Sequence, residues 1–97
     1  MHISRMDLNL FVVLETIYSE GNITRASQKL NLTQPAVSHA LGRLRDLLKD
    51  PLFVRQGANM VATPFTRNII TPVRQALQTL ELSVSEHQKF DPRLTER

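Results

Sequence analysis

The fold is decided by residues 22–48, which read N-I-T-R-A-S-Q-K-L-N-L-T-Q-P-A-V-S-H-A-L-G-R-L-R-D-L-L. This stretch holds two helical patterns, Thr24–Leu30 and Gln34–Leu48, that are too close in the chain to pack as an ordinary antiparallel hairpin. The second helix must therefore cross the first after a tight turn, which predicts a helix-turn-helix. Asn31 lies in that turn, where asparagine adopts a left-handed backbone at low cost, and Ser27 is small enough for a close approach of the helix axes. The apolar residues expected between the two helices are Ala26, Leu30, Leu32, Val37 and Ala40.

The second helix divides into an apolar and a polar face. Its inward residues, at helical spacing, are Val37, Leu41, Leu44 and Leu48. Its outward face is short, polar and basic and carries Pro35, Ser38, His39, Gly42 and Arg43. Thr33 is placed as the N-cap, and Pro35 lies in the first turn, where a missing N–H costs little. The positive end of this helix therefore suits a phosphate.

Three motifs then point to a family. The run L-T-Q-P-A-V-S-H-A-L-G-R-L, followed by P-L-F-V-R and A-T-P, resembles the N-terminal DNA-binding domain of LysR-type transcriptional regulators, with Q-P-A-V-S as its most specific part. The resemblance covers about residues 6–94. It implies a mainly α fold, a winged helix-turn-helix of three helices and a short β-hairpin wing, followed by a long linker helix that is the family's dimerisation element. Three positions depart from the family pattern: Arg45 replaces a usual Glu, Lys49–Pro51 replaces a Leu-Gly step, and Phe65-Thr66 replaces a small residue and Gly.

Length and composition favour a binding module over an enzyme. A domain of 97 residues buries about 60 to 65% of its unfolded surface and has little room for an enclosed catalytic cavity. The sequence has no cysteine, which is compatible with a cytoplasmic, reducing location. We expect no transmembrane span or signal peptide. We also expect no cofactor and no metal site, because His39 has no second His or carboxylate at ligand spacing.

The charge is concentrated on the predicted helix-turn-helix. The chain carries a net charge of +3, but residues 23–55 hold six basic groups against Asp46 and Asp50, a local excess of four. Residues 1–22 are net acidic and residues 56–97 are nearly balanced. A local basic excess of this kind favours double-stranded DNA as the partner.

Helices and a hairpin are predicted on either side of this unit. Asp7 can cap a first helix over Leu8–Ser19, whose inward stripe is Leu10, Leu14, Ile17 and Tyr18, widened by Leu8, Val12 and Val13. Gly21 should end that helix and Asn22 should cap the next. After Leu48, Lys49–Pro51 should stop the recognition helix. Residues 52–62 predict the wing, with strands Leu52–Gln56 and Met60–Ala62 around Gly57–Asn59.

Thr63 and Pro64 should open a long amphipathic helix that reaches about Glu86. Pro72 falls inside it, which predicts a kink or a break into two segments. The helix is too long to bury its apolar stripe against so small a domain, so much of the stripe is left for a second chain. The predicted dimerisation residues are Phe65, Ile69, Val73, Ala76, Leu77, Leu80 and Val84.

These elements predict three regions: a DNA-binding domain over residues 1–63, a dimerisation helix over residues 64–88, and a polar, irregular hinge over residues 89–97. The resemblance implies that the hinge leads toward an effector-binding domain that this chain lacks, and that a small-molecule effector acts only there. It also implies a bacterial regulator that binds a pseudo-palindromic operator as a homodimer, with room for a higher oligomer in the full-length protein.

The predicted DNA contacts lie on the recognition helix, on helix N-termini and on the wing. Gln34 can pair with adenine, Arg43 with guanine, and Pro35 or Ala36 can touch a thymine methyl. The full set is Thr24, Thr33, Gln34, Pro35, Ala36, Ser38, His39, Arg43 and Arg55. Lys29, Arg45, Lys49 and Arg67 are expected to be solvated charges. The alternative is a helical protein-interaction module that pairs through the long amphipathic helix.

Overall fold

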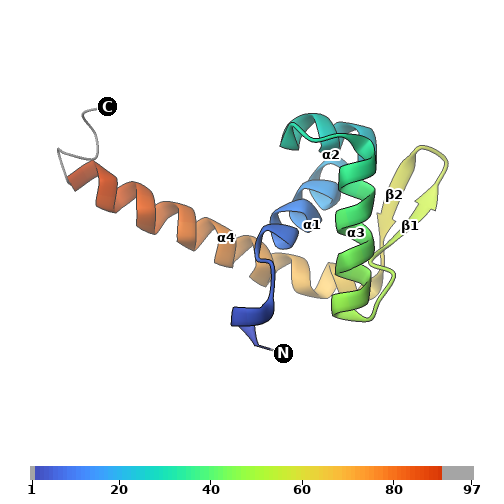
Figure 1. The fold of residues 1–97 in the computed structure, drawn as a ribbon. Helices are drawn as coiled ribbons and strands as arrows, with labels where there is room; N and C mark the ends of the chain where they lie inside the picture. The colour runs from blue at the N-terminus through green and yellow to red at the C-terminus, as the bar shows by residue number, and fades with distance from the viewer. Residues whose placement is uncertain (1, 91–97) are drawn as a thin grey trace.

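The computed structural model describes residues 2–90, and the side chains of residues 2–87. Its elements are η1 (Ile3–Arg5), α1 (Asn9–Glu20), α2 (Ile23–Leu30), α3 (Gln34–Leu48), β1 (Phe53–Gln56), β2 (Asn59–Ala62) and α4 (Pro64–Phe90). Helices α1, α2 and α3 form a head, the β1–β2 hairpin stands beside α3, and α4 runs away from the head as a single arm (Figure 1). The predicted winged helix-turn-helix with a long linker helix is confirmed.

Asp7 and Gly21 flank the first helix, as its sequence predicts, although both ends of the helix fall one residue later than predicted. The Asp7 Oδ1 accepts a hydrogen bond from the backbone N–H of Asn9 at 3.0 Å. Gly21 ends the helix with a left-handed backbone, φ 68°, a conformation that costs glycine little. The observed helix starts one residue later than the predicted Leu8 and ends at Glu20.

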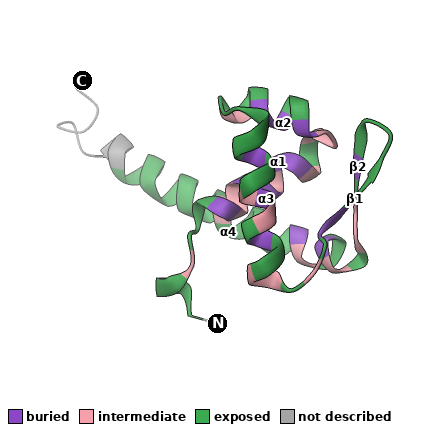
Figure 2. Cartoon of the chain, turned by 45° about the vertical axis from the view of Figure 1, so that its right-hand side comes forward, coloured by how far each residue is buried: buried purple, intermediate pink, exposed green. Residues whose placement is uncertain are grey.

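The core lies where α1, α2 and α3 meet, and the base of the wing closes it. Figure 2 shows buried residues gathered on these facing surfaces, whereas the distal part of α4 is exposed. Of the predicted inward stripe of α1, Tyr18 is half-buried and the other three residues are buried. Of the residues expected to widen it, Val13 is buried and Val12 half-buried, but Leu8 is 46% exposed because it precedes the first turn of the helix. The buried apolar cluster consists of Leu10, Val13, Leu14, Ile17, Ile23, Ala26, Val37, Leu41, Leu44, Leu52, Phe53 and Met60.

Local side-chain chemistry sets the geometry of the helix-turn-helix. Asn22 caps α2 by accepting from the N–H of Arg25 at 3.0 Å, and Thr33 caps α3 by accepting from the N–H of Ala36 at 3.2 Å. Asn31 has φ 57° and ψ 43°, the predicted left-handed conformation. These three polar residues fix where each helix stops and starts, and so the direction in which α3 leaves α2.

One helix bound and one buried residue differ from the expectation for this unit. The helix α2 begins at Ile23, one residue before the predicted Thr24, and the predicted cap Asn22 is confirmed. Leu32 does not lie between the helices and is 45% exposed. The left-handed turn brings the N–H of Leu32 onto the Ser27 carbonyl at 2.9 Å, which closes the end of α2 and leaves the leucine side chain outside.

The end of α3 depends on Lys49 rather than on Asp50 and Pro51 alone. Lys49 takes a left-handed backbone, φ 57°, which costs a residue with a Cβ about 1 to 2 kcal/mol. The Asp50 Oδ1 then accepts from the Leu52 N–H and from the Thr63 hydroxyl, both at 2.8 Å. Asp50 therefore ties the segment after α3 to the start of α4.

The wing is a two-stranded antiparallel hairpin in which Gln56 pairs with Asn59. The loop is Gly57–Ala58 alone, and Gly57 has φ 61°, as a primed turn with glycine first requires. Asn59, predicted as a loop residue, therefore belongs to β2. The first strand starts at Phe53, one residue later than predicted, because Leu52 has φ 66° and cannot extend the strand.

The long helix α4 passes through Pro72 unbroken (Figure 1). The alternative of a break into two segments is wrong. Proline removes only the bond to the Asn68 carbonyl, and both residues are exposed, so water can satisfy that carbonyl.

The helix also extends beyond the predicted Glu86, to Phe90. Its backbone therefore includes the first two residues of the predicted hinge. The remaining hinge residues, 91–97, lie outside the described part of the chain.

Candidate nucleic-acid interface

The N-terminal half of α3 presents a polar surface because its apolar side is fixed in the core. Val37 is fully buried and Leu41 nearly so. The other residues in the first two turns of the helix therefore face outward. The exposed residues of this half are Gln34, Pro35, Ala36, Ser38 and His39. All five were predicted as DNA contacts, and the structure brings them together on one surface.

The wing joins this surface through a small groove of about 140 Å³. Ser38 of α3 and Arg55 of β1 both line it, together with Arg45. Arg55 is exposed, so its guanidinium stands at the edge of the same surface as the start of α3. The predicted reading helix and the predicted wing contact are therefore neighbours.

Asn22 holds the wing in place, a role that its sequence position did not reveal. Its Nδ2 donates to the Ala58 carbonyl at the wing tip at 2.8 Å, across 36 positions in the chain, while its Oδ1 caps α2. Beside it, the Met60 N–H donates to the Gly21 carbonyl at 2.9 Å. The wing is thus anchored to the turn between α1 and α2.

We expect Asn22→Ser to loosen the wing without uncapping α2. Serine is nearly as good an N-cap as asparagine, but its short side chain cannot also reach Ala58. The free energy of unfolding should fall by about 1 kcal/mol, and amide hydrogen exchange should accelerate in residues 53–62. Asn22→Ala is the matched control. Because it removes the cap as well, its free energy of unfolding should fall by about 1 kcal/mol more than that of Asn22→Ser. Unchanged exchange in the wing of Asn22→Ser would show that the anchor is not needed.

Arg43, although predicted on the same outward face, does not line the wing groove. Its Nη1 is 3.6 Å from the Asp7 Oδ2, and the two side chains are 54% and 45% exposed. Such an exposed pair contributes little stability, so Arg43 stays available to another anion. Asp46, one turn further along, is exposed and would repel a phosphate, which favours the N-terminal half of α3 as the binding surface.

The remaining predicted contacts lie at helix N-termini. Thr24, in the first turn of α2, and Thr33, at the cap of α3, are both exposed. Lys29 and Lys49 are exposed as well, as expected for solvated charges.

A second surface, apolar and separate from the first, runs along α4. A groove of about 340 Å³ is lined by Ile3, Met6, Leu8, Phe11, Ile69, Pro72, Val73, Ala76, Leu77 and Leu80. Of the predicted dimerisation stripe, Phe65 and Ile69 pack partly against the core of the same chain, whereas Leu80 and Val84 are 57% and 56% exposed. The sequence did not reveal that the N-terminal segment supplies the other wall.

Two kinds of feature are missing from residues 2–90. No helix there combines the length and the apolar character that crossing a membrane requires. No group of three His, Cys, Asp or Glu side chains in that part of the chain is arranged to hold a metal ion.

Comparison with known proteins identifies the family. The family model for bacterial regulatory helix-turn-helix proteins of the lysR family matches residues 8–67, which run from the start of α1 into α4. The chain belongs to the LysR family. As this family consists of transcriptional regulators, the chain is a DNA-binding domain of such a regulator and not an enzyme.

Individual LysR-family relatives agree with this assignment. The chain is 41% identical over 97 residues to nodulation protein D 1 of Bradyrhizobium elkanii and spans 31% of that protein's length. The crystal structure of the probable transcriptional regulator PA0477 from Pseudomonas aeruginosa matches with a TM-score of 0.83 at 39% identity, over 87% of this chain and 28% of that one. The BenM_DBD/benA site 1 DNA complex matches with a TM-score of 0.78 at 23% identity, over 87% and 94% of the two chains, and shows the same fold.

Two departures from the LysR pattern, Arg45 and Thr66, form hydrogen bonds to main-chain carbonyls. Arg45, in place of the usual Glu, donates from Nε to the Pro51 carbonyl at 2.7 Å and from Nη2 to the Phe53 carbonyl at 3.2 Å. A carboxylate has no N–H to donate there. Arg67 donates to the Ala62 carbonyl at 3.0 Å. Both arginines are exposed, as expected for solvated charges, but each also donates to carbonyls at the base of the wing, which the sequence did not reveal.

Thr66, in place of the family's usual Gly, is fully buried. Its Oγ1 donates to the Leu52 carbonyl at 2.8 Å, and its N–H donates to the Thr63 Oγ1 at 3.3 Å. The Leu52 carbonyl thus accepts from both the Thr66 hydroxyl and the Thr63 N–H, which ties the wing to the start of α4.

Proposed function

We propose that this domain binds double-stranded DNA sequence-specifically as a homodimer, with the first half of α3 in the major groove. The observation that carries the proposal is the shared surface of α3 and the wing, where the exposed Ser38 and Arg55 line one groove and Gln34 lies exposed one helical turn before Ser38. An α-helix fits the major groove, where each base pair presents a distinct pattern of donors and acceptors.

Charge and capping support the same placement. Residues 23–55 carry six basic groups against two acidic ones, and α3 begins with a capped N-terminus whose dipole favours a phosphate. Arg55 on β1 is positioned to meet the adjacent backbone or the minor groove. We assign base reading to α3, with Gln34 first, and phosphate contact to Thr24, Thr33 and Arg55.

We infer that the dimer forms through α4 and the apolar groove beside it. Val73, Ala76, Leu77 and Leu80 line this groove with the N-terminal segment, and an exposed apolar surface of that kind marks an interaction site. Two copies related by a two-fold axis would place two α3 helices on half-sites separated by a whole number of helical turns. On this proposal residues 1–63 read DNA and residues 64–88 pair.

Selection of binding sites from a random DNA pool, followed by a salt titration, tests the proposal. We expect a pseudo-palindromic site, and log affinity should fall steeply and linearly with log salt concentration, because bound phosphates release counterions. An apolar helix interface should respond little to salt. Absence of an enriched sequence, together with a flat salt response, would favour a protein-interaction module that uses the α4 groove for a different partner.

A further inference from the structure

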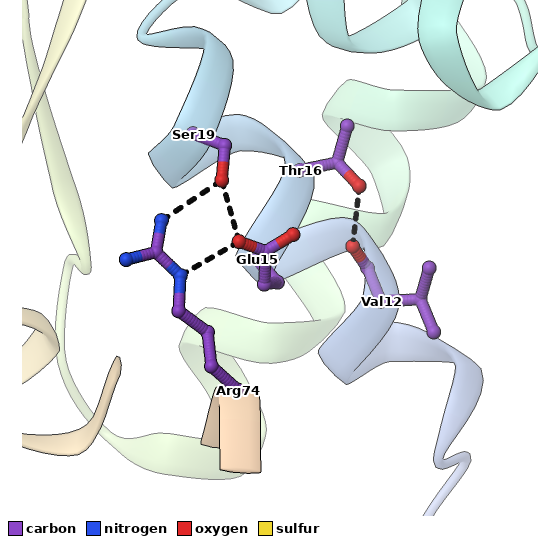
Figure 3. A network of polar contacts seen from close by, with 5 residues as sticks. All are labelled: Val12, Glu15, Thr16, Ser19 and Arg74. Carbon is purple, nitrogen blue, oxygen red and sulfur yellow. Dashed lines mark hydrogen bonds and ion pairs between the residues drawn. The ribbon is translucent and has the colours of Figure 1, made fainter. Parts of the chain in front are cut away.

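Arg74 joins α4 to α1 through the side chains of Glu15, Ser19 and Tyr18. Figure 3 shows its contacts with Glu15 and Ser19. Its Nε lies 2.8 Å from the Glu15 Oε2 and its Nη2 lies 2.9 Å from the Ser19 Oγ. The guanidinium carbon lies 4.9 Å from the centroid of the Tyr18 ring. Ser19 also donates to the Glu15 Oε2. We call these four residues the Arg74 clasp.

The clasp sits where α4 leaves the head. Before it, Thr66 and Ile70 are buried against the head. After it, Leu77 is half-buried and residues 78–87 are exposed. Among the described residues, the Arg74 contacts are the polar contacts furthest along α4. They are therefore the last directional contacts between α4 and the head before the helix becomes exposed.

Directional polar contacts can fix the angle between α1 and α4, which apolar packing alone does not fix. Burial of apolar surface has no preferred direction, so the packing of α4 on α1 tolerates small rotations. The guanidinium presents donors in a rigid planar fork, and hydrogen bonds weaken steeply when they are bent. Two hydrogen bonds and a stacked ring on one guanidinium thus favour one angle between α1 and α4.

That angle matters to DNA because α4 is the proposed dimer element and α3 the proposed reader. The described chain measures 49 Å along its longest axis, so a small rotation at the clasp displaces α3 relative to its partner copy. Changing a spacer by one base pair moves a half-site by about 3.4 Å and rotates it by about 35°. We propose that Arg74 is a positioning residue that sets the half-site spacing the dimer selects, an inference that rests on the proposed function.

The test measures affinity for paired half-sites whose spacer is lengthened or shortened one base pair at a time. The wild-type chain should prefer one spacing by about tenfold over spacings one or two base pairs away. In Arg74→Ala this preference should fall to about threefold or less, while affinity for a single half-site stays within about twofold. Arg74→Lys, which keeps the charge without the planar fork, should give an intermediate preference. Gln75→Ala, an exposed neighbour on the same helix, is the matched control and should retain the wild-type preference.

The outcomes separate this inference from the function it rests on. If Arg74→Ala and Arg74→Lys keep the wild-type spacing preference, the clasp does not set spacing, although dimeric DNA binding stands. If the wild-type chain binds two half-sites no better than one, dimeric binding fails, and the clasp proposal fails with it. A loss of single half-site affinity equal to the loss on paired sites would assign Arg74 to the stability of the head, and would also overturn the proposal.

Discussion

Replacing both Val73 and Leu80 with glutamate should convert the proposed dimer to a monomer. Val73 is half-buried and Leu80 is 57% exposed in one chain, and both line the apolar groove. In a dimer that covers the groove, each carboxylate would lose its water without gaining a partner, at a cost of the order of several kcal/mol. The dissociation constant should therefore rise by at least about a hundredfold, which sedimentation equilibrium at micromolar concentration would detect.

The same two charges on the opposite side of α4 provide the control. Thr71→Glu with Gln75→Glu adds equal charge at exposed positions away from the groove and should leave the dimer intact. Circular dichroism should show the head still folded in both double variants. A Val73→Glu, Leu80→Glu chain that still sediments as a dimer would exclude α4 as the interface.

The parts of the fold that sequence predicted well are those fixed by local chemistry. Asn22 and Thr33 cap the helices they precede, and Asn31 supplies the left-handed turn. The bounds of α3, Gln34–Leu48, agree with the prediction. Each of these features depends on a side chain that bonds to backbone within a few residues of itself. The neighbouring sequence is therefore enough to predict it.

The parts that sequence missed depend on contacts between distant segments. The Asn22 bond to the wing spans 36 positions, and the Arg74 bonds to α1 span 59 and 55. Arg45 was expected to be solvated because an isolated arginine usually is, and only the path of the loop after α3 brings carbonyls within its reach. No local pattern distinguishes an arginine that braces a loop from one that faces water.

The candidate site also combines features that local sequence predicts with features that depend on contacts between distant segments. Helical periodicity alone was enough to turn Gln34, Ser38 and His39 outward, because Val37 and Leu41 must enter the core. That Ser38 and Arg55 line one groove required the wing to fold back beside α3. The separation of Arg43 from that groove also became visible only when its pairing with Asp7 was seen.

The proposed reader and the proposed phosphate contact should respond differently to removal. Gln34 lies exposed in the first turn of α3, where its amide can pair with both edge atoms of one base. Gln34→Ala should weaken binding to the selected site by about 1 to 3 kcal/mol, weaken binding to random DNA much less, and leave the salt slope nearly unchanged. Competition binding on the two DNAs at several salt concentrations measures all three quantities.

Arg55→Ala, measured on the same two DNAs at the same salt concentrations, should weaken binding to all DNA sequences alike. It should also reduce the salt slope by about one unit per protomer. Lys29→Ala removes an equal charge from an exposed position on α2 and should change the slope less, because Lys29 does not line the wing groove. If Arg55→Ala erodes sequence preference while Gln34→Ala weakens every DNA equally, the two roles are reversed. If neither variant changes binding, the shared surface of α3 and the wing is not where DNA lies, and the exposed polar residues of α3 are simply solvated.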